Sequence, residues 1–182
     1  MRKKQKRTTP AQIIQKRRQN ILINRGYVSL FFRIVLIAFC GWLMLSQVFL
    51  LTQNSGTDMF PSIKDGDLIV AYRLQKDYAK DDVIVYEMNG KQYVGRIIAR
   101  GTDVVTMDDS GTLLVNGTAQ GGEIIYPTYA KEGMEYPYKV PENAVFVLGD
   151  YRTEATDSRD FGPVPMVSVK GKAITILRRR AL

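Results

Sequence analysis

The chain opens with a polar, basic stretch and then changes abruptly to an uninterrupted apolar run. Ile34–Leu51 holds 18 residues without a charge, and Ser46 and Gln47 are its only clearly polar members. As a helix it would be about 27 Å long, close to the hydrocarbon thickness of a bilayer. The pattern predicts a membrane anchor over residues 34–52, between a tail at residues 1–33 and an outer domain at residues 53–182.

A cleaved signal peptide is the competing interpretation of this apolar run. Its hydrophobic stretch would follow a short basic segment and end at a small-x-small cleavage site. Here more than 30 residues precede the run, and Leu50-Leu51-Thr52-Gln53 lacks such a site. A retained anchor is therefore favoured.

Beyond residue 53 the pattern changes to short apolar runs rich in β-branched residues and separated by turns. The dipeptide Asn89-Gly90 is typical of a tight hairpin turn, and Asp109-Ser110-Gly111 and Asn116-Gly117 mark two further turns. The fold class predicted is mainly β, a single membrane helix followed by a mostly antiparallel domain. The expected strands are Leu68–Tyr72, Val83–Glu87, Gln92–Ile98, Val104–Met107, Leu113–Val115, Ala144–Leu148 and Ala173–Leu177.

Charge predicts the orientation of the anchor. Residues 1–57 contain ten Lys and Arg residues and no acid, whereas residues 58–182 contain 16 basic and 18 acidic residues. The basic tail is expected in the cytoplasm at the cell membrane, with the C-terminal domain outside. Since the outer domain is slightly acidic, the overall net charge of +8 does not indicate nucleic-acid binding.

The tail itself shows a helix start at Thr9-Pro10-Ala11-Gln12, with Thr9 as the N-cap and Pro10 as the first helical residue. Ile13, Ile14, Ile21 and Leu22 would share one face of that helix, among basic residues. Two interpretations stay open: a basic amphipathic helix on anionic lipid, and a disordered tail that only sets topology.

Composition removes several kinds of chemistry. The chain has no His, so Ser-His-Asp catalysis, Cys-His catalysis and His-ligated metals are excluded. Cys40 is the only cysteine, so no intramolecular disulfide or Cys-x-x-Cys site can form. We expect neither a metal nor a small-molecule cofactor.

A segment rich in Gly, Pro and Tyr, residues 119–143, interrupts the strand pattern. It is either a long loop packed by its own aromatic side chains or a surface for a partner, because Tyr offers contact area at low entropic cost. Its candidate contact residues are Tyr126, Tyr129, Tyr136 and Tyr138.

Three blocks of sequence occur in order after the anchor. The first is Gly56-Thr57-Asp58-Met59-Phe60-Pro61-Ser62 and the second is Tyr93-Val94-Gly95-Arg96-Ile97-Ile98. The third is Gly149-Asp150-Tyr151-Arg152, running on to Asp157-Ser158-Arg159-Asp160-Phe161-Gly162. Over residues 30–177 the chain resembles the bacterial type I signal peptidases, and the third block is the most specific part of the resemblance.

The resemblance implies a membrane serine endopeptidase with a Ser/Lys dyad, in which a desolvated lysine acts as the base for a serine nucleophile. At the position of the serine this chain has Asp58, and at the position of the lysine it has Gly95. Ala155 stands where the family has a supporting serine. No intact catalytic residue is therefore expected, and the chain is predicted not to act as an enzyme in the manner of the family.

Other residues of the blocks are retained. Arg96, Asp150, Asp157 and Arg159 are expected to form buried ion pairs that hold the sheet together. Gly95 is interpreted as the vacated position of the lysine.

Replacement chemistry is conceivable but not favoured. Asp58 with Asp157 would imitate an aspartic dyad. The tripeptide Asp109-Ser110-Gly111 occurs in aspartic proteases but falls here in a predicted turn. Ser55 or Ser62 with Lys64 would need a rebuilt loop.

Signal-peptidase-like proteins that lack the dyad occur in pilus operons of Gram-positive bacteria, and the Asp-for-Ser and Gly-for-Lys pattern resembles that group. The resemblance implies a chaperone-like role in sortase-dependent pilin polymerisation, with pilin subunits or the sortase as partners. Met59 and Pro61, with the four tyrosines, are the candidate partner-binding residues. The alternatives are an active signal peptidase with unconventional residues, and an anchored scaffold without a peptide groove.

Overall fold

The computed structural model describes residues 10–121, 124 and 126–178, with side chains from residue 23 onward. The chain divides into two compact units, Met1–Ser46 and Gln47–Leu182, and each is described by itself.

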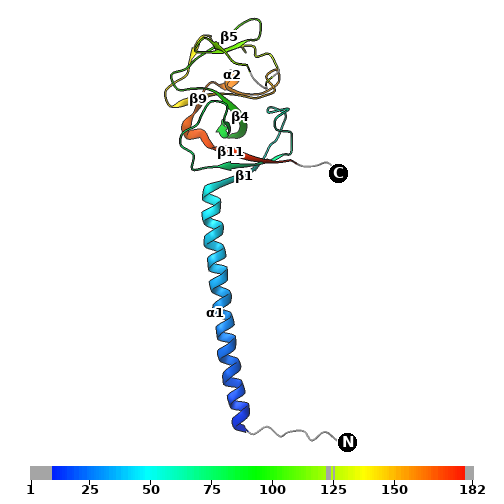
Figure 1. Ribbon diagram of the computed structural model, residues 1–182, viewed down its shortest axis with the longest axis vertical. Coiled ribbons are helices and arrows are strands. Elements are labelled where there is room, and N and C mark those ends of the chain that lie inside the picture. Colours follow the sequence, from blue (N-terminus) through cyan, green and yellow to red (C-terminus); the bar gives the residue numbers. More distant parts are fainter. Residues whose placement is uncertain (1–9, 122–123, 125, 179–182) are drawn as a thin grey trace, which may run out of the picture. The chain divides into compact units, whose positions relative to one another are not determined.

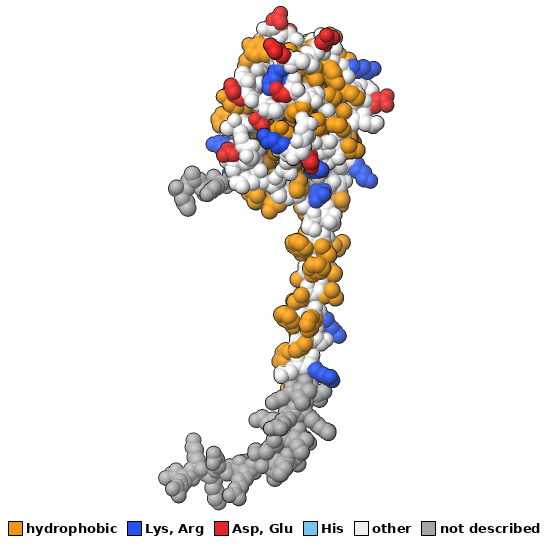
Figure 2. All heavy atoms as spheres, turned by 180° about the vertical axis from the view of Figure 1, so that it is seen from behind, with side chains coloured by type: hydrophobic (Ala, Val, Ile, Leu, Met, Phe, Trp, Pro, Cys, Tyr) orange, Lys and Arg blue, Asp and Glu red, His pale blue; other side chains and the backbone are white. Residues whose placement is uncertain are grey.

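The first unit is one helix, α1, which runs from Pro10 to Val48 (Figure 1). Its start at Pro10 agrees with the predicted helix start, whereas Thr9 and the side chains of the expected amphipathic face lie outside the described residues. The stretch Ile23–Val48 has a mean hydropathy of 2.3 and is long and apolar enough to cross a membrane. Figure 2 shows hydrophobic side chains along its described length, interrupted by two basic groups.

The predicted end of the anchor at residue 52 is wrong. The helix ends at Val48, and Phe49–Gln53 forms strand β1, which pairs antiparallel with β2 (Leu68–Tyr72). Leu50 and Thr52 are half-buried while their neighbours on the strand are exposed. Apolar content does not distinguish a helix from a strand, and here pairing with β2 decides between them.

The second unit is mainly β and antiparallel, as predicted (Figure 1). Its larger sheet has seven strands in the order β1-β2-β11-β3-β4-β9-β10. The strands not yet given are β3 (Val83–Met88), β4 (Lys91–Arg100), β9 (Ala144–Leu148), β10 (Val164–Pro165) and β11 (Val169–Leu177).

A smaller sheet has the order β7-β6-β5-β8. It consists of β5 (Val104–Met107), β6 (Leu113–Val115), β7 (Thr118–Ala119) and β8 (Tyr138–Lys139). The short helix α2 (Ser158–Phe161) and a 3-10 turn (Met166–Ser168) complete the unit.

The predicted turns are present. Asn89 and Gly90 both have positive φ, 52° and 74°, as a type I′ hairpin requires, and they join β3 to β4. Asn116 and Gly117, with φ of 52° and 76°, do the same between β6 and β7. Each predicted strand is found, although β3, β4 and β11 run further than expected; β1, β7, β8 and β10 were not predicted.

Strand β9 lies within the hydrophobic core of the unit. All five residues of β9 are buried, and their side chains alternate between two apolar clusters. Phe146 and Leu148 pack with β5 and β6, whereas Val145 and Val147 pack with Tyr86 and Ile97. The segment that follows β9 is therefore anchored on both faces, and it carries the third sequence block.

Candidate functional site

The third block is fixed to the sheet by an ion pair. The guanidinium of Arg96 on β4 donates to both carboxylate oxygens of Asp150, at 2.8 and 2.6 Å. Asp150 is fully buried. Paired charges of this geometry offset part of the desolvation cost of burial, and the pair ties β4 to the turn after β9, as predicted.

A second ion pair orders the chain further on. Asp157 and Arg159 are both almost fully buried and are joined by two hydrogen bonds of 2.9 and 2.8 Å. Asp157 is also the N-cap of α2, in a capping box with Asp160, and accepts a hydrogen bond from the backbone of Gly149. The prediction that both residues take part in a buried ion pair is confirmed.

The first block lies directly against the third. The carbonyl of Asp58 accepts a 2.9 Å hydrogen bond from the backbone of Tyr151. A Cβ placed on Gly149 would lie 2.5 Å from that same carbonyl oxygen and 2.3 Å from the Cβ of Ala155. Only glycine fits at this contact, so residues 58, 149 and 155 form one tightly packed junction.

The carboxyl of Asp58 is half-buried at the edge of a cavity of about 240 Å³. Desolvation raises its pKa above the usual range, and a hydrogen bond from the backbone of Thr156 and the charges of Lys91 and Lys131 oppose that rise. The cavity is lined by Gln53, Asn54, Ser55, Asp58, Lys91, Gln92, Tyr93 and Val94.

The space in front of Gly95, where the resemblance places the lysine, is closely packed. A Cβ on Gly95 would lie 2.5 Å from Cγ1 of Val147 and 3.3 Å from Cε1 of Tyr86. Tyr86 in turn stacks on Tyr93 with a centroid distance of 5.8 Å, and Phe161 packs against both rings. The side-chain space in front of residue 95 is thus filled by neighbours, and this contact requires glycine.

Ala155, at the position of the supporting serine, is fully buried. Its carbonyl accepts a 2.7 Å hydrogen bond from Lys131, which also forms an ion pair of 2.7 Å with Asp160. The backbone of Tyr129 accepts a further bond from Arg159. The described part of the tyrosine-rich segment is therefore held against the third block.

The sequence reasoning missed the two lysines near Asp58. The strand pattern could have predicted that Lys91 lies on the same face as Gly95, because alternate residues of a strand, here 91, 93 and 95, share one face. Its ammonium group lies 5.0 Å from the ring centroid of Tyr93. Lys131 comes from a segment without a strand pattern, and no sequence feature indicated its place.

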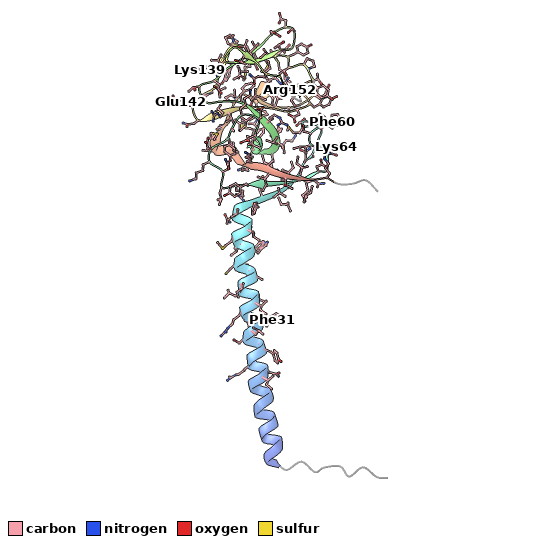
Figure 3. The ribbon with its side chains drawn as sticks, viewed as in Figure 1. Phe31, Phe60, Lys64, Lys139, Glu142 and Arg152 are labelled. Carbon is pink, nitrogen blue, oxygen red and sulfur yellow. The ribbon has the colours of Figure 1, made fainter. Side chains whose placement is uncertain are left out.

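The alternative catalytic pairs do not assemble. Both carboxylate oxygens of Asp157 bond to Arg159, so neither is available to share a proton with Asp58. Asp109-Ser110-Gly111 lies in the β5–β6 hairpin turn, as predicted. Lys64 is exposed (Figure 3), and within the described residues no hydrogen bond joins it to Ser55 or Ser62.

Most of the candidate partner residues are packed inside the unit. Met59 is fully buried in a core cluster with Ile63 and Ile69, so its assignment to a partner surface is wrong. Tyr136 and Tyr138 pack on the core, and Tyr126 packs against Tyr151. Pro61 and Tyr129 are exposed. The segment is thus largely a loop packed by its own aromatic side chains.

The arrangement of these blocks is explained by a family match. The model of the family described as "Signal peptidase, peptidase S26" matches residues 24–177. The chain belongs to this signal peptidase family. Together with the apolar helix, membership of the signal peptidase family indicates association with a membrane.

Two relatives within the signal peptidase family illustrate the extent of the likeness. The "Probable thylakoidal processing peptidase 2, chloroplastic" of Arabidopsis thaliana is 31% identical over 131 residues, which cover 65% of this chain and 35% of that protein. Signal peptidase I of Bacillus caldolyticus is 30% identical over 133 residues, covering 64% of this chain and 72% of that protein.

Among solved structures, a signal peptidase I from Enterococcus faecalis V583 is similar at 30% identity with a TM-score of 0.46. The likeness covers 55% of this chain and 98% of that one.

Two cations, Lys91 and Lys131, act on the carboxylate of Asp58. The nearest cations each have other contacts, Lys91 with the ring of Tyr93 and Lys131 with Asp160 and Ala155. A carboxylate in a small polar cavity can accept hydrogen bonds or pair with a cation. Within the described residues, no group of His, Cys, Asp and Glu could hold a metal ion.

Proposed function

We propose that this member of the signal peptidase family binds exported polypeptides without cleaving them and assists sortase-dependent polymerisation of surface pilins. The observation that carries the proposal is the pair Asp58 and Gly95, which occupy the positions that the resemblance assigns to the nucleophile and the base. The proposed partners are pilin subunits and the sortase, and no cofactor is required.

The chemistry of this pair supports inactivity. A serine hydroxyl becomes a nucleophile only when a base takes its proton, and the base must be desolvated and close. Asp58 has no hydroxyl, and Gly95 has no side chain at all. The close contact of Val147 with Gly95 leaves no room for a base to enter from a neighbouring strand.

The scaffold around the pair supports peptide binding. Strand β9 pairs with residues Arg96–Arg100 of β4 but not with the preceding residues 91–94, which line the Asp58 cavity. Within the described residues, the edge of β4 at 91–94 away from β3 has no strand partner. An extended polypeptide can add to such an edge through main-chain hydrogen bonds, which do not need the nucleophile.

Topology is part of the proposal. The acid-free basic tail places the N-terminus in the cytoplasm and the β unit outside the membrane, where exported pilins and sortases meet. Protease added to intact protoplasts should digest residues 53–182 and leave the basic tail intact. Protection of the β unit would contradict this orientation.

Site-specific photocrosslinking tests the binding site in cells that assemble pili. A crosslinker in place of Gln92, on the free edge of β4, should capture a pilin or the sortase. A crosslinker in place of Lys139, which is exposed on β8, is the matched control and should capture neither. Capture from Tyr129 but not from Gln92 would instead support the scaffold without a peptide groove.

An active signal peptidase is the second candidate, because the relatives of this chain carry names of processing peptidases and signal peptidases. If pili still polymerise after deletion of the gene, the assembly role is contradicted and an active signal peptidase becomes the favoured function. Cleavage of a preprotein decides between the two directly.

A further inference from the structure

A second cavity, of about 310 Å³, lies in the β unit away from Asp58. It is lined by Ile98 of β4, Leu113 of β6 and residues of the segment that follows β7, so it lies between the two sheets. None of its lining residues also lines the Asp58 cavity. Figure 3 shows Arg152, one of the lining residues, inside the β unit.

Arg152 is the unusual member of this lining. It is 5% exposed, and its guanidinium donates to the carbonyl of Gly149 at 2.9 Å and to the hydroxyl of Thr128 at 2.8 Å. Both acceptors are neutral, and within the described residues Arg152 has no carboxylate partner at ion-pair distance. The third nitrogen of its guanidinium, Nη2, has no hydrogen bond to any described residue.

The other two arginines of the blocks differ in this respect, since Arg96 and Arg159 each hold a carboxylate by two hydrogen bonds. Burial lowers the pKa of Arg152 to about 10. The charge of Asp150 opposes part of this effect. Hydrogen bonds to neutral groups offset less of the desolvation cost of a cation than an ion pair does, and an anion in the adjoining cavity would offset more of it.

The rest of the lining suits a ligand with one anionic end and a small apolar body. Lys80, at the cavity, is hydrogen-bonded to Gln120 and adds a cation to Arg152 and the ion-paired Arg96. Among the lining residues that the structure describes, Asp81 is the one acid. Thr112 and Thr128 supply hydroxyls, whereas Ile98, Leu113 and Pro127 supply apolar walls.

We propose that this cavity binds a carboxylate carried on a small apolar residue, as at the C-terminus of a polypeptide, with Arg152 as the group that holds the carboxylate. A planar carboxylate matches the donors of a guanidinium, and the apolar walls accept the adjoining side chain. This assignment does not depend on peptide binding at Asp58.

The test uses the full chain in detergent micelles and two probes of nearly equal shape, N-acetyl-leucine and N-acetyl-leucinamide. Binding is followed by the change in NMR signals of the probe and by the midpoint of thermal unfolding. The carboxylate should bind in a saturable manner and the amide at least about tenfold more weakly, because only the carboxylate can pair with the guanidinium.

Two variants locate the site. Arg152→Gln should weaken the binding of N-acetyl-leucine by about tenfold or more, and Lys80→Met, which changes an exposed side chain and leaves the core intact, by a few fold. Lys91→Met, in the other cavity, is the matched control and should bind as the unaltered chain does.

Equal binding of the two probes would overturn the proposal. It would also be overturned if both single variants, Lys80→Met and Arg152→Gln, bound N-acetyl-leucine with unchanged affinity. If Arg152→Gln does not fold, the comparison of the two probes and the Lys80→Met variant still decides. Because neither probe involves pilins or cleavage, failure here leaves the proposed function untouched.

Discussion

Val147 packs directly on the face of Gly95: a Cβ at residue 95 would lie 2.5 Å from Cγ1 of the valine. The two residues sit on adjacent strands, β4 and β9, and Val147 belongs to a fully buried strand. The missing side chain at residue 95 is therefore a packing requirement of the present fold, in addition to being a missing base.

This contact predicts a stability cost for any side chain at residue 95. Gly95→Ala should lower the free energy of unfolding by about 1–3 kcal/mol, because a buried Cβ overpacks the contact and valine has few alternative rotamers. Gly121→Ala is the matched control and should change it little, since among the described residues a Cβ there would meet no further atom within 4 Å and its φ is not positive. Thermal and denaturant unfolding of the full chain in micelles measure both.

The same contact predicts the outcome of restoring the dyad. Asp58→Ser with Gly95→Lys should remain inactive, since the lysine has no room beside Val147 and Tyr86. Adding Val147→Ala should recover the stability lost in Gly95→Lys, so that the two changes are strongly non-additive in a double-mutant cycle. Additive effects would show that the two side chains do not compete for space.

The raised pKa of Asp58 predicts how stability depends on pH. An acid whose pKa is higher in the folded state opposes folding once it is ionised, so its cost is absent well below pH 4 and grows as pH rises through the folded pKa. Asp58→Asn should therefore gain stability relative to the unaltered chain at pH 7, and the gain should shrink at pH 4. A gain that is equal at both pH values would show that the carboxyl is not desolvated.

The two classes of ion pair predict different costs of breaking them. Arg159→Met leaves Asp157 buried without its partner and should lower the free energy of unfolding by about 3–5 kcal/mol. Lys170→Met breaks an ion pair with Glu87 in which both side chains are more than a third exposed, and it should cost about 0–1 kcal/mol. A similar loss of unfolding free energy in the two variants would contradict the claim that the buried Asp157–Arg159 pair stabilises the third block.

The sequence predicted the strands well where turn chemistry marked their ends. The Asn-Gly pairs at 89–90 and 116–117 demand positive φ at both residues, which only a tight turn satisfies, so the flanking strands were delimited on physical grounds. The end of the anchor was misplaced because Phe49, Leu50 and Leu51 continue the apolar run of the helix, and only the register with β2 shows that they belong to a strand.

The site was predictable in its ion pairs and not in its packing. That the two arginines and two acids of the blocks form ion pairs follows from the sequence, since buried charges need partners. The pairing of Arg96 with Asp150 and of Arg159 with Asp157 comes from the structure. The packing of the site depends on contacts between residues distant in sequence. Examples are the contact of Val147 with Gly95, the hydrogen bond from Lys131 to the carbonyl of Ala155, and the core cluster that buries Met59. No local pattern encodes such contacts.

The absence of peptidase activity is the central claim, and cleavage of a preprotein tests it most directly. The full chain in micelles is incubated with a preprotein that carries a signal peptide, beside signal peptidase I of Bacillus caldolyticus as the active control, and product is measured by mass spectrometry. We predict cleavage by the control and none by this chain, because Asp58 and Gly95 provide neither nucleophile nor base. A product released at the signal-peptide junction by this chain, and lost in Asp58→Ala, would contradict the account.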